Sequence, residues 1–325
     1  MNRLFRDVAG PCLAPRGSAV CIGAFDGVHP GHRAVLSNVV KRAAHRDLLP
    51  VAISFAPIPR AYFAKDAGMP QLSCVRERIA ALFAAGMQKV LMLRFNARLA
   101  AMEPKEFVQS VLVKRLAVRE VWVGTEFRFG HQRAGDVDTL RAMGSRAGFD
   151  VEIAPTVERD GQRVSSSRIR TLLAAGDFDA SARLLGRRFA IGGHVVYGLQ
   201  LGRRLGYPTA NLPLRGRVAP VGGVFAVRVH GVGANARPGV ASLGVRPTVN
   251  GTEPLLEAHL FDFDGDLYGK RIEVEFVTKL RDEEKFENLD AMVEQIDRDA
   301  TQARDILKSL SPNSVRGEAG VTERG

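Results

Sequence analysis

The 325-residue chain is predicted to be an α/β protein with two domains, a doubly wound parallel sheet followed by an antiparallel β-barrel. Its length exceeds what one hydrophobic core usually spans. In the first half, short apolar runs alternate with amphipathic helical patterns, which is typical of a parallel sheet. After Arg187 the glycines become frequent and the apolar runs shorten, which favours antiparallel strands.

The first domain is expected to cover residues 1–186. An apolar run at 20–24 predicts a buried strand, and the pattern at 34–40 predicts the helix that follows it. The later strand candidates are 51–55, 89–93, 120–124 and 150–154, and the helices between them are 76–85, 104–116 and 137–147. In sheets of this type ligands bind beyond the carboxyl ends of the strands, so the loop after the first strand is the expected site.

The second domain is expected to cover residues 187–310, as a small closed barrel and one terminal helix at 289–310. The strand candidates are 192–196, 223–229, 239–243, 255–261 and 272–276. Residues 311–325 are polar and are expected to be a disordered tail.

The composition favours an enzyme of the cytoplasm that acts on small molecules. No apolar run approaches the length of a membrane helix, so no membrane partner is expected. Cys12, Cys21 and Cys74 have neither metal nor redox spacing, which agrees with a reducing compartment. The net charge of +11 attracts polyanions, but aromatic residues are only 7% and the arginines are scattered. This favours phosphorylated small substrates over nucleic acid, and the sequence does not specify an oligomeric state.

The segment GAFDGVHPGH, residues 23–32, carries the strongest chemical signal. Gly27 and Gly31 let the backbone approach a ligand, and the helix that follows offers unpaired amide donors and a positive dipole end to an anion. His29 and His32 are three residues apart, so they can face the same way and donate to oxygens that gain charge. A tight turn with two exposed histidines is the alternative interpretation.

The segment VSSSRIR, residues 164–170, places three hydroxyls before a helix that carries two arginines. Hydroxyl and guanidinium groups both bind phosphate oxygens, although Ser165 or Ser166 would equally serve as an ordinary helix cap.

Together these two segments resemble the H-x-G-H and S-S-T-x-I-R signatures of the nucleotidyltransferase superfamily, with Ser167 in place of the threonine. The resemblance implies a Rossmann-like domain that grips the triphosphate of ATP. It implies catalytic roles for His29, His32 and Arg170. The residues that it implies for nucleotide binding are Gly23, Phe25, Asp26, Gly27, Gly31, Ser165, Ser166, Ser167 and Arg168.

The segment VGTEFRFGHQRAGD, residues 123–136, reads from its residues as a loop with stacked core phenylalanines. It also resembles the V-G-x-D-F-x-F-G segment of the FMN adenylyltransferase module, with Glu126 for the commoner aspartate. The resemblance implies flavin binding by Gly124, Glu126, Phe127 and Phe129.

In LGRRLGYPTANL, residues 201–212, Thr209 and Asn211 are two apart and are expected on one side of an extended strand. A hydroxyl and an amide oxygen are suitable ligands for Mg2+. GYPTAN resembles the riboflavin kinase signature, in which these two positions serve the metal and the nucleotide phosphates. The lead-in resembles that family's ATP-covering loop, which implies nucleotide binding by Gly202, Gly206 and Pro208.

The aspartates of LEAHLFDFDGDLYG, residues 256–269, suggest a calcium loop, but Leu267 stands where an EF-hand needs glycine. GDLYGK is one residue short of a Walker phosphate loop. The run instead resembles the riboflavin kinase segment E-x-H-L-x-D-F-x-x-D-L-Y-G, which implies that Glu257 is the catalytic base. Residues 280–299 resemble the terminal strand and helix of that family.

Six motifs in the same order, over residues 19–307, resemble the bacterial bifunctional riboflavin kinase and FMN adenylyltransferase family. The resemblance implies phosphorylation of riboflavin to FMN and adenylylation of FMN to FAD, with ATP and Mg2+. This chain has Ile58 where the family commonly has histidine, Ser242 where asparagine is frequent, and Phe225 where tyrosine is frequent. Three alternatives stay open: a kinase with an impaired adenylyltransferase domain, a nucleotidyltransferase for another acceptor, and a basic RNA-binding or regulatory protein on the same scaffold.

Overall fold

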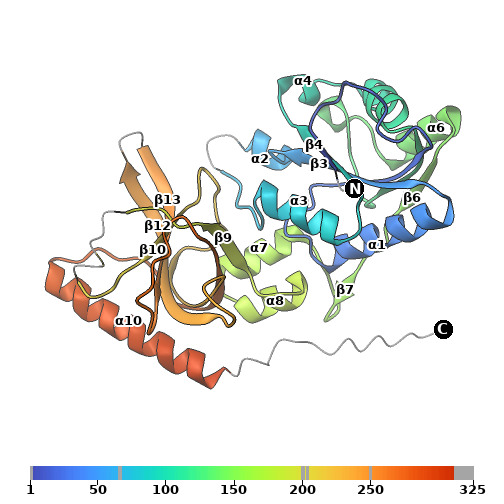
Figure 1. Cartoon of the computed structure of the whole chain (residues 1–325). Coiled ribbons are helices and arrows are strands. Elements are labelled where there is room, and N and C mark those ends of the chain that lie inside the picture. The colour runs from blue at the N-terminus through green and yellow to red at the C-terminus, as the bar shows by residue number, and fades with distance from the viewer. Residues whose placement is uncertain (1–2, 65–67, 199–201, 203–204, 249–250, 311–325) are drawn as a thin grey trace. The chain divides into compact units, whose positions relative to one another are not determined.

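The computed structural model describes residues 3–64, 68–198, 202, 205–248 and 251–310 (Figure 1). The chain divides into two compact units, Met1–Ile169 and Arg170–Gly325. The tail expected at 311–325 lies outside the described residues. Among the described helices, none has the length and apolar character needed to cross a membrane.

The first unit contains a six-stranded sheet in the order β1-β4-β3-β2-β5-β6, with every neighbouring pair parallel. The strands are β1 (Arg3–Phe5), β2 (Ser18–Ile22), β3 (Leu49–Ala56), β4 (Lys89–Arg94), β5 (Val118–Val123) and β6 (Asp150–Ile153). This confirms the predicted doubly wound sheet. β1 was not predicted, because it is a three-residue edge strand whose first two residues are exposed.

Helices cover both faces of this sheet, because consecutive residues of its strands point to opposite sides. Ala19 and Cys21 of β2 pack in one buried cluster with Leu36 and Val39 of α1. Val20 lies in a second cluster on the other face. The helical elements of this unit are α1 (Pro30–His45), α2 (Pro59–Phe63), α3 (Val75–Ala84), α4 (Ala97–Ala100), α5 (Pro104–Phe107), η2 (Val108–Arg115), η3 (His131–Arg133) and α6 (Val137–Ala147). Helix α7 (Ser166–Ala174) begins in the first unit and continues beyond Ile169 into the second.

The single helix expected at 104–116 is divided into α5 and a π-helical segment, η2. The amide of Val108 is shared between the carbonyls of Pro104 and Lys105, so the regular bonding pattern changes at this residue. A small hairpin, β7 (Glu158–Arg159) and β8 (Gln162–Arg163), precedes α7 and was not expected.

The second unit contains an antiparallel sheet in the order β10-β13-β12-β11-β14-β9. A bridge between Val196 and Asn211 joins the two edges, so the sheet closes as the predicted barrel. The strands are β9 (Ala190–His194), β10 (Ala210–Pro213), β11 (Gly223–His230), β12 (Arg237–Thr248), β13 (Gly251–Leu260) and β14 (Arg271–Arg281).

Helix α10 (Leu289–Ser309) packs along the outside of this barrel, against β11, β12 and β14 (Figure 1). Ala303 and Leu307 of the helix share a buried cluster with Val224 and Val240 of the strands. Helix α8 (Phe178–Leu185) was not predicted, although Asp177 caps its first turn and Gly186 ends it in the left-handed conformation.

Glu120 is a buried carboxylate that ties α1 to the sheet. Its side chain is 0% exposed and accepts hydrogen bonds from Arg42, Arg46 and the Trp122 indole, at 2.7 Å for the closest atoms of Arg46 and of Trp122. Burial would raise the pKa of Glu120, but these hydrogen bonds outweigh it and lower the pKa. The carboxylate is therefore charged in the folded protein at neutral pH.

We expect Glu120→Gln to lower the free energy of unfolding of the first unit by about 1–3 kcal/mol, because the two partly exposed arginines and the Trp122 indole lose a charged hydrogen-bond acceptor. The stabilisation is present above the pKa of an unfolded glutamate, about 4.3, and is lost as the pH falls through the lower folded value. Trp122 is the only tryptophan of the chain, so its fluorescence during urea unfolding reports on this unit. The control is Asp138→Asn, which breaks an exposed pair with Arg141 and is expected to change stability by less than about 0.5 kcal/mol. Equal losses in the two variants would contradict the prediction.

Candidate functional site

The loop between β2 and α1 turns sharply, because three of its residues have positive φ. These are Phe25 (49°), Gly27 (81°) and Val28 (43°). Phe25 and Val28 are held in this strained conformation by burial, with 2% and 4% exposure. A side chain at Gly23 would meet the Phe25 ring, which explains the glycine at the end of the strand. The loop therefore presents its backbone at the carboxyl edge of the sheet.

His29 and His32 lie with their rings stacked, 3.7 Å between centroids. His29 caps α1, and its Nδ1 accepts a hydrogen bond from the His32 amide at 3.4 Å. A side chain at Gly31 would meet the His29 ring, so this glycine makes room for the cap. Burial and the neighbouring charge of His29 lower the pKa of His32 well below its ordinary value. His32 is consequently a neutral imidazole at pH 7, with one N–H to donate.

The Asp26 carboxylate anchors this loop to the segment that precedes α3. It accepts hydrogen bonds from the amides of Leu72 and Ser73 and from the Ser73 hydroxyl, at 2.9–3.1 Å. Ser73 Oγ also accepts from the amide of Gly27 at 2.9 Å. Through these contacts Asp26 stabilises the conformation of the loop, in addition to the nucleotide-binding role that its motif implies.

Arg78 of α3 is a fully buried arginine that no sequence signal singled out. Its Nη1 donates to the carbonyls of Ala24 and Phe55, at 2.9 and 3.1 Å. It thereby ties the chain after β2 to the end of β3, under the histidine loop.

The serine segment lies against the histidine loop, although 140 residues separate them in sequence. Ser166 Oγ donates to the carbonyl of Asp26 at 3.0 Å. Ser165 Oγ accepts from the amide of Arg168 at 3.3 Å and so caps α7, which was the alternative interpretation of this hydroxyl. Ser167 Oγ accepts from Arg60 Nη1 at 3.1 Å. The fold thus brings both phosphate motifs to one edge of the sheet.

Arg60 is a cation of this site that sequence reasoning missed. It lies on α2, immediately after the Pro57-Ile58-Pro59 segment, and its contact with Ser167 brings it to the serine segment. The only available signal was a basic residue following that segment. Ile58 itself is 2% exposed, so the position where the family commonly has histidine is filled here by a buried apolar side chain. Arg168 is exposed, and Arg170 follows Ser166 by one turn on α7.

The four residues implied for flavin binding follow β5 on the same edge and have different environments. Phe129 is buried in the core and stacks on Phe127, with 5.5 Å between centroids. Glu126 pairs with Arg163 at 2.8 Å. Gly124 is exposed, and a side chain there would meet nothing. The core environment of Phe129 agrees with the packing interpretation of this segment, and the flavin role of the four residues stays a prediction.

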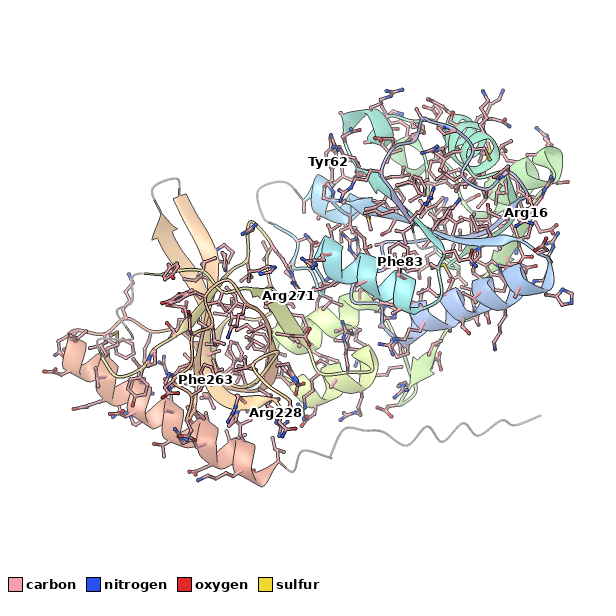
Figure 2. The ribbon with its side chains drawn as sticks, viewed as in Figure 1. Arg16, Tyr62, Phe83, Arg228, Phe263 and Arg271 are labelled. Atoms are coloured by element: carbon pink, nitrogen blue, oxygen red, sulfur yellow. The ribbon has the colours of Figure 1, made fainter. Side chains whose placement is uncertain are left out.

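A cluster of four aromatic rings at the carboxyl ends of β3 and β4 was also missed from sequence. Tyr62, labelled in Figure 2, lies edge-on to Phe63 and Phe95, and Phe95 lies edge-on to Phe55. Phe63 is 62% exposed, so the cluster offers an apolar surface at the carboxyl edge.

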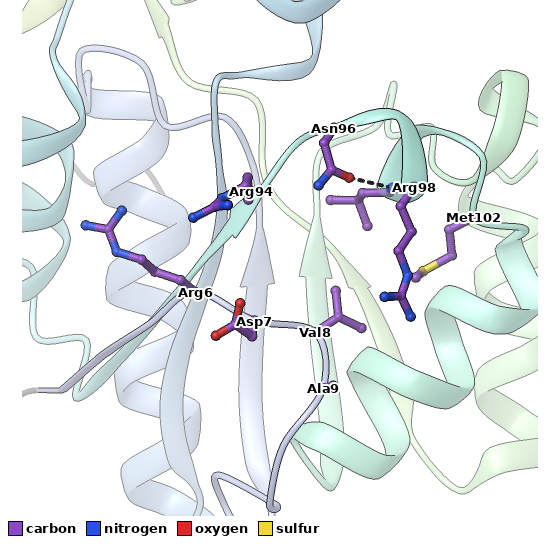
Figure 3. Close-up of a pocket in the computed structure, with 9 residues that line it drawn as sticks. Arg6, Asp7, Val8, Ala9, Arg94, Asn96, Arg98 and Met102 are labelled. Atoms are coloured by element: carbon purple, nitrogen blue, oxygen red, sulfur yellow. Dashed lines mark hydrogen bonds between the residues drawn. The ribbon is translucent and has the colours of Figure 1, made fainter.

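A cavity of about 300 Å³ lies farther along this edge, where β1 and β4 end (Figure 3). Arg6, Arg94 and Arg98 surround it together with Asp7 and Asn96, and Val8, Leu99 and Met102 line its apolar part. Its lining residues all lie in segments 6–9 and 94–102, so the cavity does not include the histidine loop.

In the second unit, Asn211, Glu257 and Ser242 form a row across three strands. Asn211 of β10 pairs with Glu257 of β13, and Glu257 pairs with Ser242 of β12. Directly paired residues of antiparallel strands share a face, so the three side chains lie on one side of the sheet. Leu212, Leu243 and Leu256 alternate with them and are buried, which places the row outside the barrel core.

Thr209 precedes Asn211 by two residues. Asn211 is 5% exposed, and its Nδ2 donates to the carbonyl of Thr209 at 3.3 Å. This hydrogen bond uses the amide nitrogen and orients Oδ1 as the acceptor. A hydroxyl and an amide oxygen fit the oxygen chemistry of Mg2+, and the metal role of this pair stays a prediction. Among the described residues there is no group of three or more His, Cys, Asp and Glu that could hold a metal ion.

In its described part, the loop that leads to Thr209 has glycines at positions where a side chain would not fit. A side chain at Gly198 would overlap the Asn211 amide, and one at Gly202 would meet the Tyr207 carbonyl. The amides of Leu205 and Tyr207 donate to the Gly202 carbonyl, and Gly206 has a φ of 86°. The carbonyl of Pro208 accepts from His259 Nδ1 at 2.9 Å. The rest of the predicted ATP-covering loop, 199–201 and 203–204, lies outside the described residues.

Both parts of the chain match known protein families. The sequence model of the FAD synthetase family matches residues 13–168, and that of the riboflavin kinase family matches residues 185–307. The bifunctional riboflavin kinase/FMN adenylyltransferase of Escherichia coli (strain K12) is 42% identical over 311 residues, 95% of this chain and 99% of that protein. The protein of the same name from Pseudomonas fluorescens is 45% identical over 290 residues, 89% of this chain and 93% of that protein.

A crystal structure described as a macrolide-efflux protein from Streptococcus pneumoniae aligns with a TM-score of 0.75 at 27% identity, covering 95% of this chain and 99% of that one. The two family matches occur in the order in which the two motif sets and the two folds follow each other. The chain therefore belongs to the family of bifunctional riboflavin kinase/FMN adenylyltransferases.

Proposed function

We propose that this chain converts riboflavin to FMN in its second unit and FMN to FAD in its first, using one ATP for each step. The observation that carries the proposal is the pair of separate polar sites. One is the junction of the histidine loop with the serine segment, and the other is the row of Asn211, Glu257 and Ser242.

In the kinase step, Glu257 accepts the proton of the 5′-hydroxyl of riboflavin while that oxygen attacks the γ-phosphorus of ATP, and ADP leaves. Phosphoryl transfer depends on in-line positioning and on neutralisation of charge. Thr209 and Asn211 would hold Mg2+, which supplies that neutralisation. Gly202, Gly206 and Pro208 belong to the loop that covers the nucleotide.

In the adenylylation step, the phosphate of FMN attacks the α-phosphorus of ATP, and pyrophosphate leaves. This phosphate is already a nucleophile, so the protein has only to position it and to stabilise developing charge. His29 and His32 at the start of α1 serve this purpose, together with Ser166 and Arg170 of α7. Arg60 adds a cation beside Ser167.

The proposal is tested by incubating purified protein with riboflavin, ATP and Mg2+ and separating the flavins by chromatography. We expect FMN to appear first and FAD to follow, and we expect EDTA to stop FMN formation because the γ-phosphate loses its counter-ion. Accumulation of FMN without FAD would favour the second candidate, a kinase with an impaired adenylyltransferase unit, which Ile58 motivates. Absence of both products would contradict the proposal. It would favour the remaining alternative, an RNA-binding or regulatory protein. RNA binding that weakens as the salt concentration rises would then support that alternative.

The three cysteines agree with action in the reducing cytoplasm. Cys12, Cys21 and Cys74 are free thiols, and burial raises the pKa of Cys21 far above its ordinary value, which makes it inert.

A further inference from the structure

His259 of β13 is the histidine of the E-x-H-L segment and has no part in the two proposed reaction steps. It lies two residues from Glu257, so both side chains belong to the same side of the sheet. Its ring donates a hydrogen bond from Nδ1 to the carbonyl of Pro208 at 2.9 Å. This hydrogen bond joins the strand that carries Glu257 to the peptide group between Pro208 and Thr209.

The strand register brings Thr209 and His259 together. Asn211 of β10 pairs directly with Glu257 of β13. Because the two strands are antiparallel, two residues back along one strand correspond to two residues forward along the other. Thr209, just before β10, is therefore opposite His259. The two residues implied for the metal thus face the implied catalytic base and its neighbouring histidine.

Both peptide groups that flank Thr209 accept a hydrogen bond from a side chain. The carbonyl of Pro208 accepts from His259, and the carbonyl of Thr209 itself accepts from Asn211 Nδ2 at 3.3 Å. Fixing both peptide planes fixes the φ and ψ of the residue between them, and so the direction of its Cα–Cβ bond. Thr209 is β-branched, so its hydroxyl has few positions open to it once the backbone is fixed. The two hydrogen bonds together set the place of the Thr209 hydroxyl.

The His259 ring is held in place by aromatic neighbours. Tyr207 and Phe261 both lie edge-on to it, with 5.2 and 5.8 Å between centroids. Phe261 is buried, and the guanidinium carbon of Arg304 of α10 lies 4.1 Å from the centroid of its ring. Rotation of the imidazole away from Pro208 would break these ring contacts as well as the hydrogen bond.

The proton of this hydrogen bond lies on Nδ1. Burial lowers the pKa of His259, although the hydrogen bond to Pro208 acts in the opposite direction. The ring is therefore neutral at pH 7 and carries one N–H, and a carbonyl oxygen can only accept. A charged ring would also donate from Nδ1, so the contact does not depend on the titration of His259.

We propose that His259 is a positioning residue of the kinase step, which orients the Thr209 hydroxyl toward the metal-bound phosphates of ATP through the carbonyl of Pro208. This inference rests on the proposed kinase function and adds to it a residue that acts through Thr209 and not on the substrate. Without the hydrogen bond, the peptide group before Thr209 is free to turn. The incoming metal and nucleotide then have to order the site, and this cost weakens their binding.

The first measurement is the Mg2+ concentration that gives half-maximal phosphorylation of riboflavin at a fixed ATP concentration. We expect His259→Leu to raise it about 3- to 10-fold, the effect of one lost hydrogen bond. His259→Asn is expected to stay within about 2-fold of wild type, because its amide N–H lies close to the place of Nδ1 and keeps the bond. His259→Gln places its amide farther out, near the place of Nε2, and is expected to behave like His259→Leu. The riboflavin Kd without ATP and the formation of FAD from added FMN are expected to stay unchanged in all three variants.

Hydrogen exchange in the ligand-free protein gives a readout that needs neither metal nor turnover. We expect the amides of residues 207–212 to exchange at least about 3-fold faster in His259→Leu and His259→Gln, and at the wild-type rate in His259→Asn. His230→Leu is the matched control, because His230 also makes a side-chain hydrogen bond in the barrel, to Glu275 at 3.0 Å, but between β11 and β14. This control is expected to change neither the Mg2+ requirement nor the exchange of residues 207–212.

Three results would overturn the inference. One is a wild-type Mg2+ requirement in folded His259→Leu and His259→Gln. Another is equal impairment of His259→Asn and His259→Gln, which would show that the ring packing matters and the N–H does not. The third is a raised riboflavin Kd with an unchanged Mg2+ requirement, which would place His259 on the acceptor side.

Thermal unfolding midpoints close to wild type show which variants are folded. If His259→Leu does not fold, the comparison of His259→Asn with His259→Gln decides the question, because both side chains are polar amides. Failure of the proposed function itself is distinguishable. Wild-type protein would then form no FMN, whereas the difference in hydrogen exchange between the variants would remain.

Discussion

Replacing Glu257 by glutamine is expected to lower kcat for FMN formation by about 10²- to 10⁴-fold, the range that general-base catalysis supplies. Glutamine has nearly the same size, and the strand register that pairs position 257 with Asn211 and Ser242 is made by the backbone, so it is kept. It has no basic carboxylate to take the hydroxyl proton. The loss is therefore expected in kcat, with little change in the KM for riboflavin.

The first unit supplies the control for this variant. When FMN is provided directly, Glu257→Gln is expected to form FAD at the wild-type rate. Kinase turnover close to wild type in Glu257→Gln would show that Glu257 is not the base.

Replacing His32 by alanine is expected to lower the rate of FAD formation by about 10²-fold, the effect of removing one positioned donor to a developing negative charge. His32 is neutral at pH 7, because burial and the charge of His29 lower its pKa, so the lost interaction is a hydrogen bond and not an ion pair. The rate is measured from added FMN and ATP, by chromatography of the flavins.

His45 provides the matched control, because it is an exposed histidine in the last turn of the same helix. His45→Ala is expected to leave both activities unchanged, and His32→Ala to leave FMN formation unchanged. Unaltered Trp122 fluorescence shows that the first unit is folded. A loss of both activities in folded His32→Ala would contradict the assignment of the two steps to separate sites.

Much of the architecture was predictable, because each element has a local signal. Alternating apolar runs and helical patterns predicted five of the six parallel strands to within about two residues, and the shorter runs after Arg187 predicted the barrel. The errors lie where the local signal is weak or is overruled. β1 is too short to show a period, and α5 changes to η2 where one amide is shared between two carbonyls.

The site was predictable only as motifs. Sequence spacing placed His29 and His32 together at the start of a helix. It also placed Thr209 and Asn211 two residues apart, with Thr209 just before a strand and Asn211 within it. The loop around Phe129 carried both a flavin signature and a packing pattern, and sequence alone could not distinguish them. Packing placed this ring in the core.

The sequence by itself determined which chemical groups exist, in which order, and on which local elements, because periodicity, capping and turn preferences act over a few residues. Only the tertiary structure decided which of them meet. The contact of Ser166 with Asp26 and the contact of Arg60 with Ser167 join segments that are far apart in the chain. Such contacts follow from strand order, register and packing of side chains, which depend on the whole fold and leave no trace in the spacing of nearby residues.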